Sequence, residues 1–152
     1  MGQSTNAILC HGFSFDEEYE FPWGDGEEEL EEWWLEINGY SPPFELFNKD
    51  GNWLDGKEAP QEKVNIYFAA QRQFLREHPL PMALVLHCSG DYPMFILATP
   101  SSVMEAYRGY PKMLDPEHLQ VNIKELRTLE RFCEQWELEG DGPAWWLVSL
   151  WI

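Results

Sequence analysis

The chain has 152 residues, of which 44% are hydrophobic and eight are Trp, and it carries a formal net charge of −17. This length suits one domain, and the apolar content excludes a disordered chain despite the charge. The acidity also excludes direct electrostatic binding of nucleic acid, which requires clustered Lys and Arg. Any partner attracted by charge is therefore expected to be basic.

Targeting features are not evident in the sequence. It has no apolar run of about 18 residues, which a membrane-spanning helix requires, and its first residues lack the basic and apolar regions of a secretory signal. The three cysteines, Cys10, Cys88 and Cys133, show no disulfide-framework spacing. We therefore expect a cytoplasmic protein with reduced cysteines and no membrane contact.

Four segments predict β-structure. Residues 82–99 form two apolar runs joined by Ser89-Gly90-Asp91-Tyr92, which predicts a largely buried central hairpin. Residues 5–15 predict a strand in the interior of the sheet, where Gly12 marks a bulge or a close approach. Residues 144–152 are apolar on both faces and predict a strand buried inside the sheet, and residues 103–106 predict a short edge strand.

Three segments predict helices that cover this sheet. The first ends at Asn38-Gly39, the second spans residues 60–78, and the third spans residues 123–137 with a capping box formed by Asn122 and Glu125. A short helical turn is expected at Asp115-Pro116-Glu117. The fold class predicted is α+β, a single domain over 1–152 with a mixed or antiparallel sheet of about four strands and about three helices.

The negative charge is concentrated at the start of the chain. Residues 1–48 contain twelve Asp and Glu and no Lys or Arg, whereas the remaining residues contain fifteen acids and ten bases. Eleven of the twelve acids lie in residues 16–37. Within this acidic segment the helical spacing of its apolar residues predicts one buried stripe, formed by Leu30, Trp33, Trp34 and Ile37.

The helix model places the carboxylates of this segment on an exposed face. Glu28, Glu32 and Glu36 point away from the stripe, Glu29 and Glu31 flank it, and Asp25 caps the start of the helix. Neighbours at i and i+4 lie roughly 5–6 Å apart, a spacing similar to that of successive phosphates. Two interpretations stay open: a solvated face that keeps a Trp-rich protein soluble, or a surface that imitates nucleic acid.

An enzymatic interpretation rests on two Cys-His neighbours, Cys10-His11 and His87-Cys88. A nucleophilic Cys88 with His11 or His87 and Asp91 would suit a small hydrolase. Adjacent strand residues point to opposite faces, so all four residues cannot converge on a zinc ion. We expect satisfied core residues here, with no metal site, no cofactor and no catalytic residue.

Parts of the two strand regions resemble a family of small proteins encoded by tailed bacteriophages and prophages. The resemblance covers about a quarter of the chain and rests on these residues: Gly2-Gln3-Ser4-Thr5-Asn6-Ala7-Ile8-Leu9, Gly12-Phe13, Asp16-Glu17-Glu18 and Tyr92-Pro93-Met94-Phe95-Ile96-Leu97-Ala98. It implies a setting, the cytoplasm of an infected bacterium, and transfers no site because these motifs are structural.

The hypothesis that follows is a phage-like acidic protein that binds a basic surface of a host nucleic-acid-handling or defence protein, as a nucleic-acid mimic or inhibitor. Its predicted partner-binding residues are Asp25, Glu28, Glu29, Glu31, Glu32 and Glu36. The alternatives are the Cys/His hydrolase and a structural or assembly protein of the virion. The oligomeric state is left open by the sequence.

Overall fold

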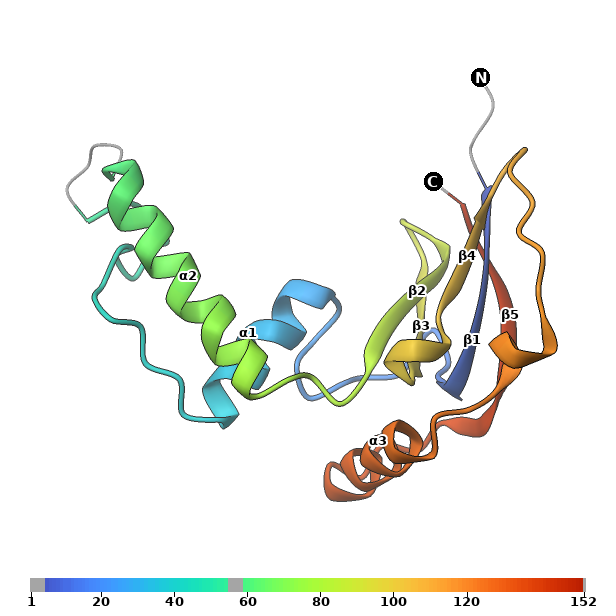
Figure 1. Cartoon of the computed structure of the whole chain (residues 1–152). Helices are drawn as coiled ribbons and strands as arrows, with labels where there is room; N and C mark the ends of the chain where they lie inside the picture. The colour runs from blue at the N-terminus through green and yellow to red at the C-terminus, as the bar shows by residue number, and fades with distance from the viewer. Residues whose placement is uncertain (1–4, 55–58, 152) are drawn as a thin grey trace. The chain divides into compact units, whose positions relative to one another are not determined.

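The computed structural model describes residues 5–54 and 59–151, and within them the chain has an α+β fold with three α-helices and a five-stranded mixed sheet (Figure 1). The predicted fold class is thereby confirmed. The chain divides into two compact units. The sequence pattern predicts a single domain over 1–152. The sheet unit comprises Met1–Glu27 and Pro81–Ile152, and the helical unit comprises Glu28–Leu80.

The sheet unit is built on five strands: β1 (Thr5–Ser14), β2 (Ala83–Ser89), β3 (Pro93–Ala98), β4 (Met104–Tyr107) and β5 (Asp141–Trp151). Their order is β3-β2-β5-β1-β4, and β3 also pairs with β1. The pairings therefore close into a ring, β1-β3-β2-β5, with β4 beside the first half of β1. All pairings are antiparallel except that of β2 with β5.

The expected hairpin is confirmed, and both of its strands lie inside the sheet because each pairs on both edges. The core lies on the face where β1 contributes Ile8 and Cys10, β2 contributes Val85, and β3 contributes Ile96 and Ala98. Trp146, Val148 and Leu150 of β5 pack against this cluster. The period-two alternation of the strands explains the set, since each strand supplies every second residue.

Gly12 lies at a close approach of the β1 and β3 backbones, one of the two features predicted for it. A Cβ atom added to Gly12 would lie 2.0 Å from the carbonyl oxygen of Leu97. The β1–β5 register also shifts between Gly12 and Ser14, which marks the expected irregularity. Only glycine permits this approach of two backbones.

The short helix η1 (Pro100–Ser102) interrupts the edge along which β3 and β4 both pair with β1. Side-chain and backbone groups fill the gap in the ladder. The backbone N–H of His11 donates to Oγ of Ser102 at 2.9 Å, and the N–H of Thr99 donates to the carbonyl of His11 at 2.9 Å. Both polar groups of the buried His11 backbone are thereby satisfied.

Helix α3 (Ile123–Gln135) follows a short turn, η2 (Pro116–Leu119), which confirms both predicted elements. Asn122 caps α3, because its Oδ1 accepts from the N–H groups of Lys124 and Glu125. The Glu125 carboxylate accepts instead from the backbone and the hydroxyl of Ser101. The Asn122 half of the predicted capping box is therefore confirmed, whereas the Glu125 half is wrong, because that carboxylate ties α3 to η1.

The acidic loop that follows β1 is held down by aromatic side chains. Phe15, Phe21 and Trp23 are buried, the rings of Phe21 and Trp23 stack at 4.7 Å, and Phe21 contacts Phe95 of β3. Trp23 in turn contacts Phe132 of α3 at 6.2 Å. The exposed acids of this loop are thus carried on a packed segment.

The helical unit contains α1 (Glu27–Ile37), which begins at the last residue of the sheet unit, and α2 (Gln61–Glu77). Both helices are predicted, but their apolar faces differ from the prediction. In α1 the buried residues are Leu30 and Leu35, whereas Ile37 is 40% exposed. No residue of α2 is buried, although its length and spacing suggest a packed helix.

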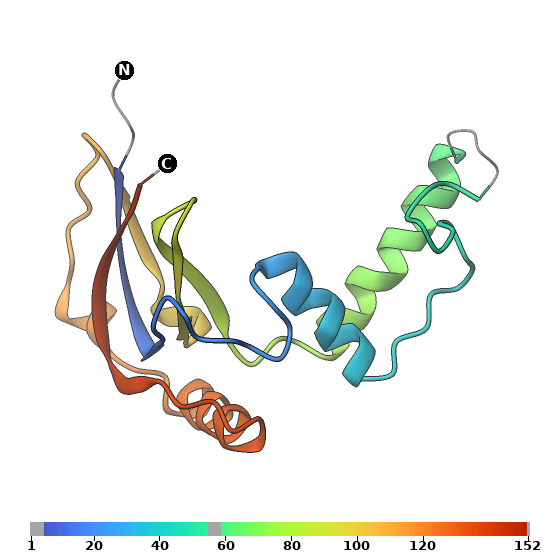
Figure 2. The same ribbon diagram turned by 180° about the vertical axis from the view of Figure 1, so that it is seen from behind.

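The last strand corrects a prediction. β5, red in Figure 2, lies inside the sheet between β1 and β2, but part of its outer face is exposed. Leu147 is 76% exposed and Trp151 is 55% exposed. The expectation that both faces are buried is therefore wrong for the side that carries these two residues. Ile152 of the predicted strand and Gly2, Gln3 and Ser4 of the resemblance lie outside the described residues.

Candidate functional site

The carboxylates of α1 are carried on a regular helix with a defined end. Asn38 and Gly39 end it, because Gly39 adopts a positive φ of 74° and the N–H of Tyr40 donates to the carbonyl of Leu35. The side-chain amide of Asn38 donates to the carbonyl of Trp34 at 2.7 Å. This arrangement is the glycine-based helix end that the sequence predicts.

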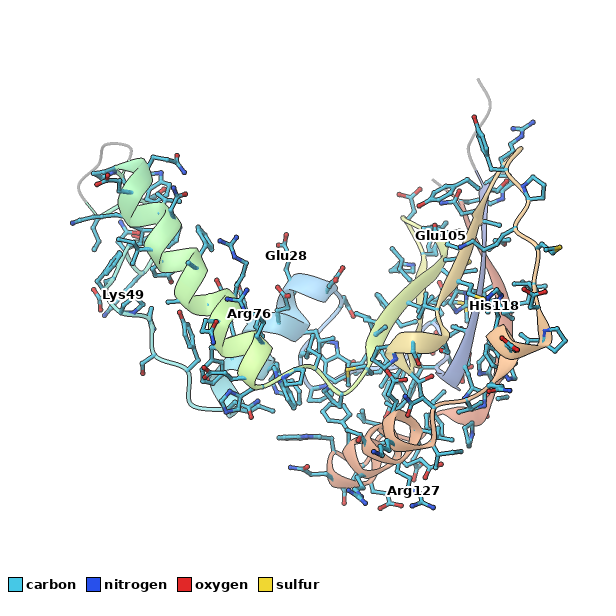
Figure 3. The ribbon with its side chains drawn as sticks, in the orientation of Figure 1. Glu28, Lys49, Arg76, Glu105, His118 and Arg127 are labelled. Carbon is cyan, nitrogen blue, oxygen red and sulfur yellow. The ribbon has the colours of Figure 1, made fainter. Side chains whose placement is uncertain are left out.

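Five of the six predicted partner-binding residues are exposed and the sixth is half-buried. Asp25, Glu28, Glu29, Glu32 and Glu36 are exposed, and Glu31 is half-buried. Figure 3 shows the Glu28 side chain extending away from α1. Across the described parts of the chain, none of the six forms an ion pair with Lys, Arg or His. No ion pair within the described residues therefore neutralises the negative charge of this face.

Aromatic contacts join α1, α2 and the segment between them. The indole N–H of Trp34 donates to the carbonyl of His78, which follows α2, at 2.7 Å, and the rings of Tyr40 and Phe74 lie 5.0 Å apart. The segment between the helices packs on α2 through Phe47, whose ring lies 6.0 Å from that of Tyr67. The helical unit is thus held by a few large side chains.

An open hollow of about 320 Å³ lies between the two helices of this unit. Three predicted site residues, Glu28, Glu31 and Glu32, form one wall; the residues from α2 are Phe68, Gln71, Arg72 and Leu75. Glu29, Glu36 and Asp25 are not part of its lining. The hollow therefore presents carboxylates opposite apolar and amide side chains, with one cationic group, Arg72.

Sequence reasoning missed the contribution of α2 to this hollow. The sequence did contain a signal, the apolar residues along α2. The helix buries none of its residues, and Ile66 and Phe68 are exposed. It also missed a second acidic hollow, of about 790 Å³, in the sheet unit. That hollow is lined by Phe13, Glu130, Cys133, Glu134, Glu137, Leu138 and Glu139.

The Cys and His residues of the two Cys-His neighbours differ in burial. His87 is buried while Cys88 is exposed, so the two neighbours lie on opposite faces of β2. Burial raises the pKa of Cys10 to about 11, the opposite of what a nucleophilic thiolate needs. Among residues 5–54 and 59–151, no group of three or more His, Cys, Asp or Glu side chains is placed to hold a metal ion.

None of the helices in the described ranges has the length and apolar character needed to cross a membrane. The sequence matches no protein-family model, no curated protein and no solved structure.

Proposed function

We propose that this chain is an interaction protein, and that α1 and the loop before it bind a basic surface of a nucleic-acid-handling protein. The observation that carries the proposal is the exposed row Glu28, Glu32 and Glu36 on an ordered helix, where none of the three forms an ion pair within the described residues. The absence of Lys and Arg from the first 48 residues extends this one-signed character.

The geometry of the row supports mimicry of a phosphate backbone. Side chains at i and i+4 on a helix lie roughly 5–6 Å apart at Cβ, and like charges at this spacing destabilise an isolated helix by a few tenths of a kcal/mol per pair. A groove that binds nucleic acid presents Lys and Arg at similar intervals. Binding in such a groove would relieve the repulsion between these carboxylates, so partner binding would also stabilise the helix.

The hollow between α1 and α2 would add selectivity to this attraction. Charge complementarity mainly raises the association rate and suppresses wrong partners. Phe68 and Leu75 offer apolar contact beside Glu28 and Glu31. A partner that carries an apolar side chain among its Lys and Arg residues would therefore gain further binding energy. A purely cationic polymer would not use these side chains.

The resemblance to phage-encoded proteins suggests a biological setting. In an infected bacterium, the proteins with basic nucleic-acid grooves include nucleases and defence complexes of the host. We propose such a host protein as the partner, with the phage-like chain occupying the groove and acting as its inhibitor. This chain itself would make no contact with nucleic acid.

The experiment is capture of bacterial proteins on the immobilised chain, followed by competition. The expected result is a captured protein that is released by a short DNA duplex, and released far less by polyglutamate of equal total charge. Binding should weaken strongly between about 50 mM and about 500 mM salt, because the Debye length falls from about 14 Å to about 4 Å over this range. A Glu28/Glu32/Glu36→Gln variant, the triple glutamine variant, should lose capture.

A matched control removes the same charge from the second acidic hollow, through Glu134/Glu137/Glu139→Gln. These three side chains are exposed and belong to the sheet unit. The control variant should capture the partner as the wild type does. Capture that survives in the triple glutamine variant, or that is insensitive to salt, contradicts the proposal. Loss of capture in the control variant alone also contradicts it and assigns the binding site to the second acidic hollow.

A further inference from the structure

The outer face of the sheet unit exposes apolar residues, Leu147 and Trp151 among them, in a protein of net charge −17. The β-strand register places two rows of residues across β4, β1 and β5 on this face. One row is large, Met104–Leu9–Leu147, and the next is small, Ala106–Ala7–Ser149. Neither row contains an Asp or Glu.

A groove of about 170 Å³ lies over these rows. Its walls come from both rows and from the segment that follows β4, which runs beside the sheet in Figures 1 and 2. The lining residues are Ala7, Leu9, Met104, Glu105, Ala106, Lys112, Leu114 and Leu147. This volume suits one branched apolar side chain. Leu147 lies beside the groove and is 76% exposed, so the same face carries both a cavity and a side chain that fits it.

We infer that this face is the interface of a two-fold dimer between copies of this chain. In an isologous interface each residue i that contacts j is matched by j contacting i. The two-fold operation would place Leu147 of each copy in the groove of the other, and the large row of one copy against the small row of its mate. Few single faces are complementary to themselves in this way.

The charges at the groove favour a second copy over a foreign partner. Its lining contains one acid, Glu105, and one base, Lys112. Two copies facing each other would each contribute one charge of each sign, so no net charge is brought into the interface. A strongly basic or strongly acidic partner would find no matching charge here. The face is therefore separate in chemistry from the acidic helix.

Salt distinguishes this association from the proposed partner binding. The remaining charges of two copies repel each other, and salt screens that repulsion without weakening apolar contact. Raising the salt from about 50 mM to about 500 mM should therefore strengthen the dimer, whereas it weakens binding at α1. The two proposals thus predict opposite responses, and either can fail alone.

The test is sedimentation velocity of the full chain over concentrations from about 1 to about 200 µM at both salt levels. The wild type should form a dimer, more tightly at high salt. Leu147→Glu should raise the dissociation constant at least about a hundredfold, because the residue counts twice at a two-fold interface. Ser149→Trp, which fills the small row from an exposed position, should act in the same direction.

Ile123→Glu is the matched control, because Ile123 is 55% exposed in the same unit but lies at the start of α3. It should dimerise as the wild type does, and circular dichroism should show all variants folded. A wild type that stays monomeric at every concentration and salt would overturn the inference and leave the groove to a different partner. A Leu147→Glu variant that dimerises normally would overturn it as well.

Discussion

Gly12→Ala tests the claim that two backbones meet at β1 and β3. The added Cβ would lie 2.0 Å from the carbonyl oxygen of Leu97 and 2.8 Å from Cα of Ala98. Both are backbone atoms and cannot rotate away, so β3 must withdraw by about 1 Å to reach an allowed contact. Overpacking of this kind costs about 1–3 kcal/mol, and about two weakened ladder hydrogen bonds add about 1 kcal/mol each.

The expected loss in the free energy of unfolding is therefore about 3–5 kcal/mol, a large part of the 5–15 kcal/mol typical of a domain. Urea unfolding followed by Trp fluorescence should show the midpoint falling by about 2 M. The indole N–H of Trp146 donates to the carbonyl of Gly12 at 2.9 Å, so the emission also reports on this site.

Gly90→Ala is the control for the loss of a glycine. An added Cβ there meets no atom within 4 Å, and its φ lies outside the left-handed region. The unfolding free energy of this variant should stay within about 0.5 kcal/mol of the wild type. If Gly12→Ala costs less than about 1 kcal/mol, the strands can separate freely and the close approach is not a constraint on the fold.

Three other predictions concern polar groups. Ser102→Ala removes the acceptor of the buried His11 N–H and should lower the unfolding free energy by about 1–3 kcal/mol in urea titrations, and a loss below about 0.5 kcal/mol contradicts this role. Burial lowers the pKa of His11 and of His87 from 6.5, so the unfolded chain binds more protons than the folded chain below that pH. The unfolding free energy should therefore fall from pH 6.5 toward pH 5, by up to about 1.4 kcal/mol per pH unit for each His. His87→Leu should halve that slope. The triple glutamine variant removes two like-charge i, i+4 pairs and should unfold with a free energy about 0.5 kcal/mol higher, whereas a loss above about 1 kcal/mol means that these carboxylates have a structural role.

The strands were predictable because their patterns are local. The hairpin of β2 and β3, the interior position of β1 and the close approach at Gly12 all follow from alternation, turn residues and one conspicuous glycine. The repair of the ladder by Ser102 was not predictable, because it depends on β3 and β4 sharing one edge of β1. That arrangement joins residues about 90 positions apart in the sequence.

The candidate site was predictable in its charge and not in its shape. Helical spacing places the carboxylates of α1 on an exposed face, but it assigned Ile37 to the buried stripe where the structure buries Leu35. The stripe depends on which side of α1 the neighbouring segment covers, and periodicity alone does not contain that information. The same reason hid the hollow, since Phe68 and Leu75 meet α1 only after α2 has packed.

The uncovered face of β5 shows how charge and apolar surface are separated in this chain. An apolar strand normally predicts burial on both sides, yet Leu147 and Trp151 are left exposed. Most acids of the described residues lie outside the strands, and the exceptions are Glu105 of β4 and Asp141 of β5. Carboxylates within the two rows would repel a second copy, and further exposed apolar residues on α1 would weaken the response of that surface to a basic partner. Under the two proposals, this separation would let one small protein associate with itself through the sheet face and attract a basic partner through α1.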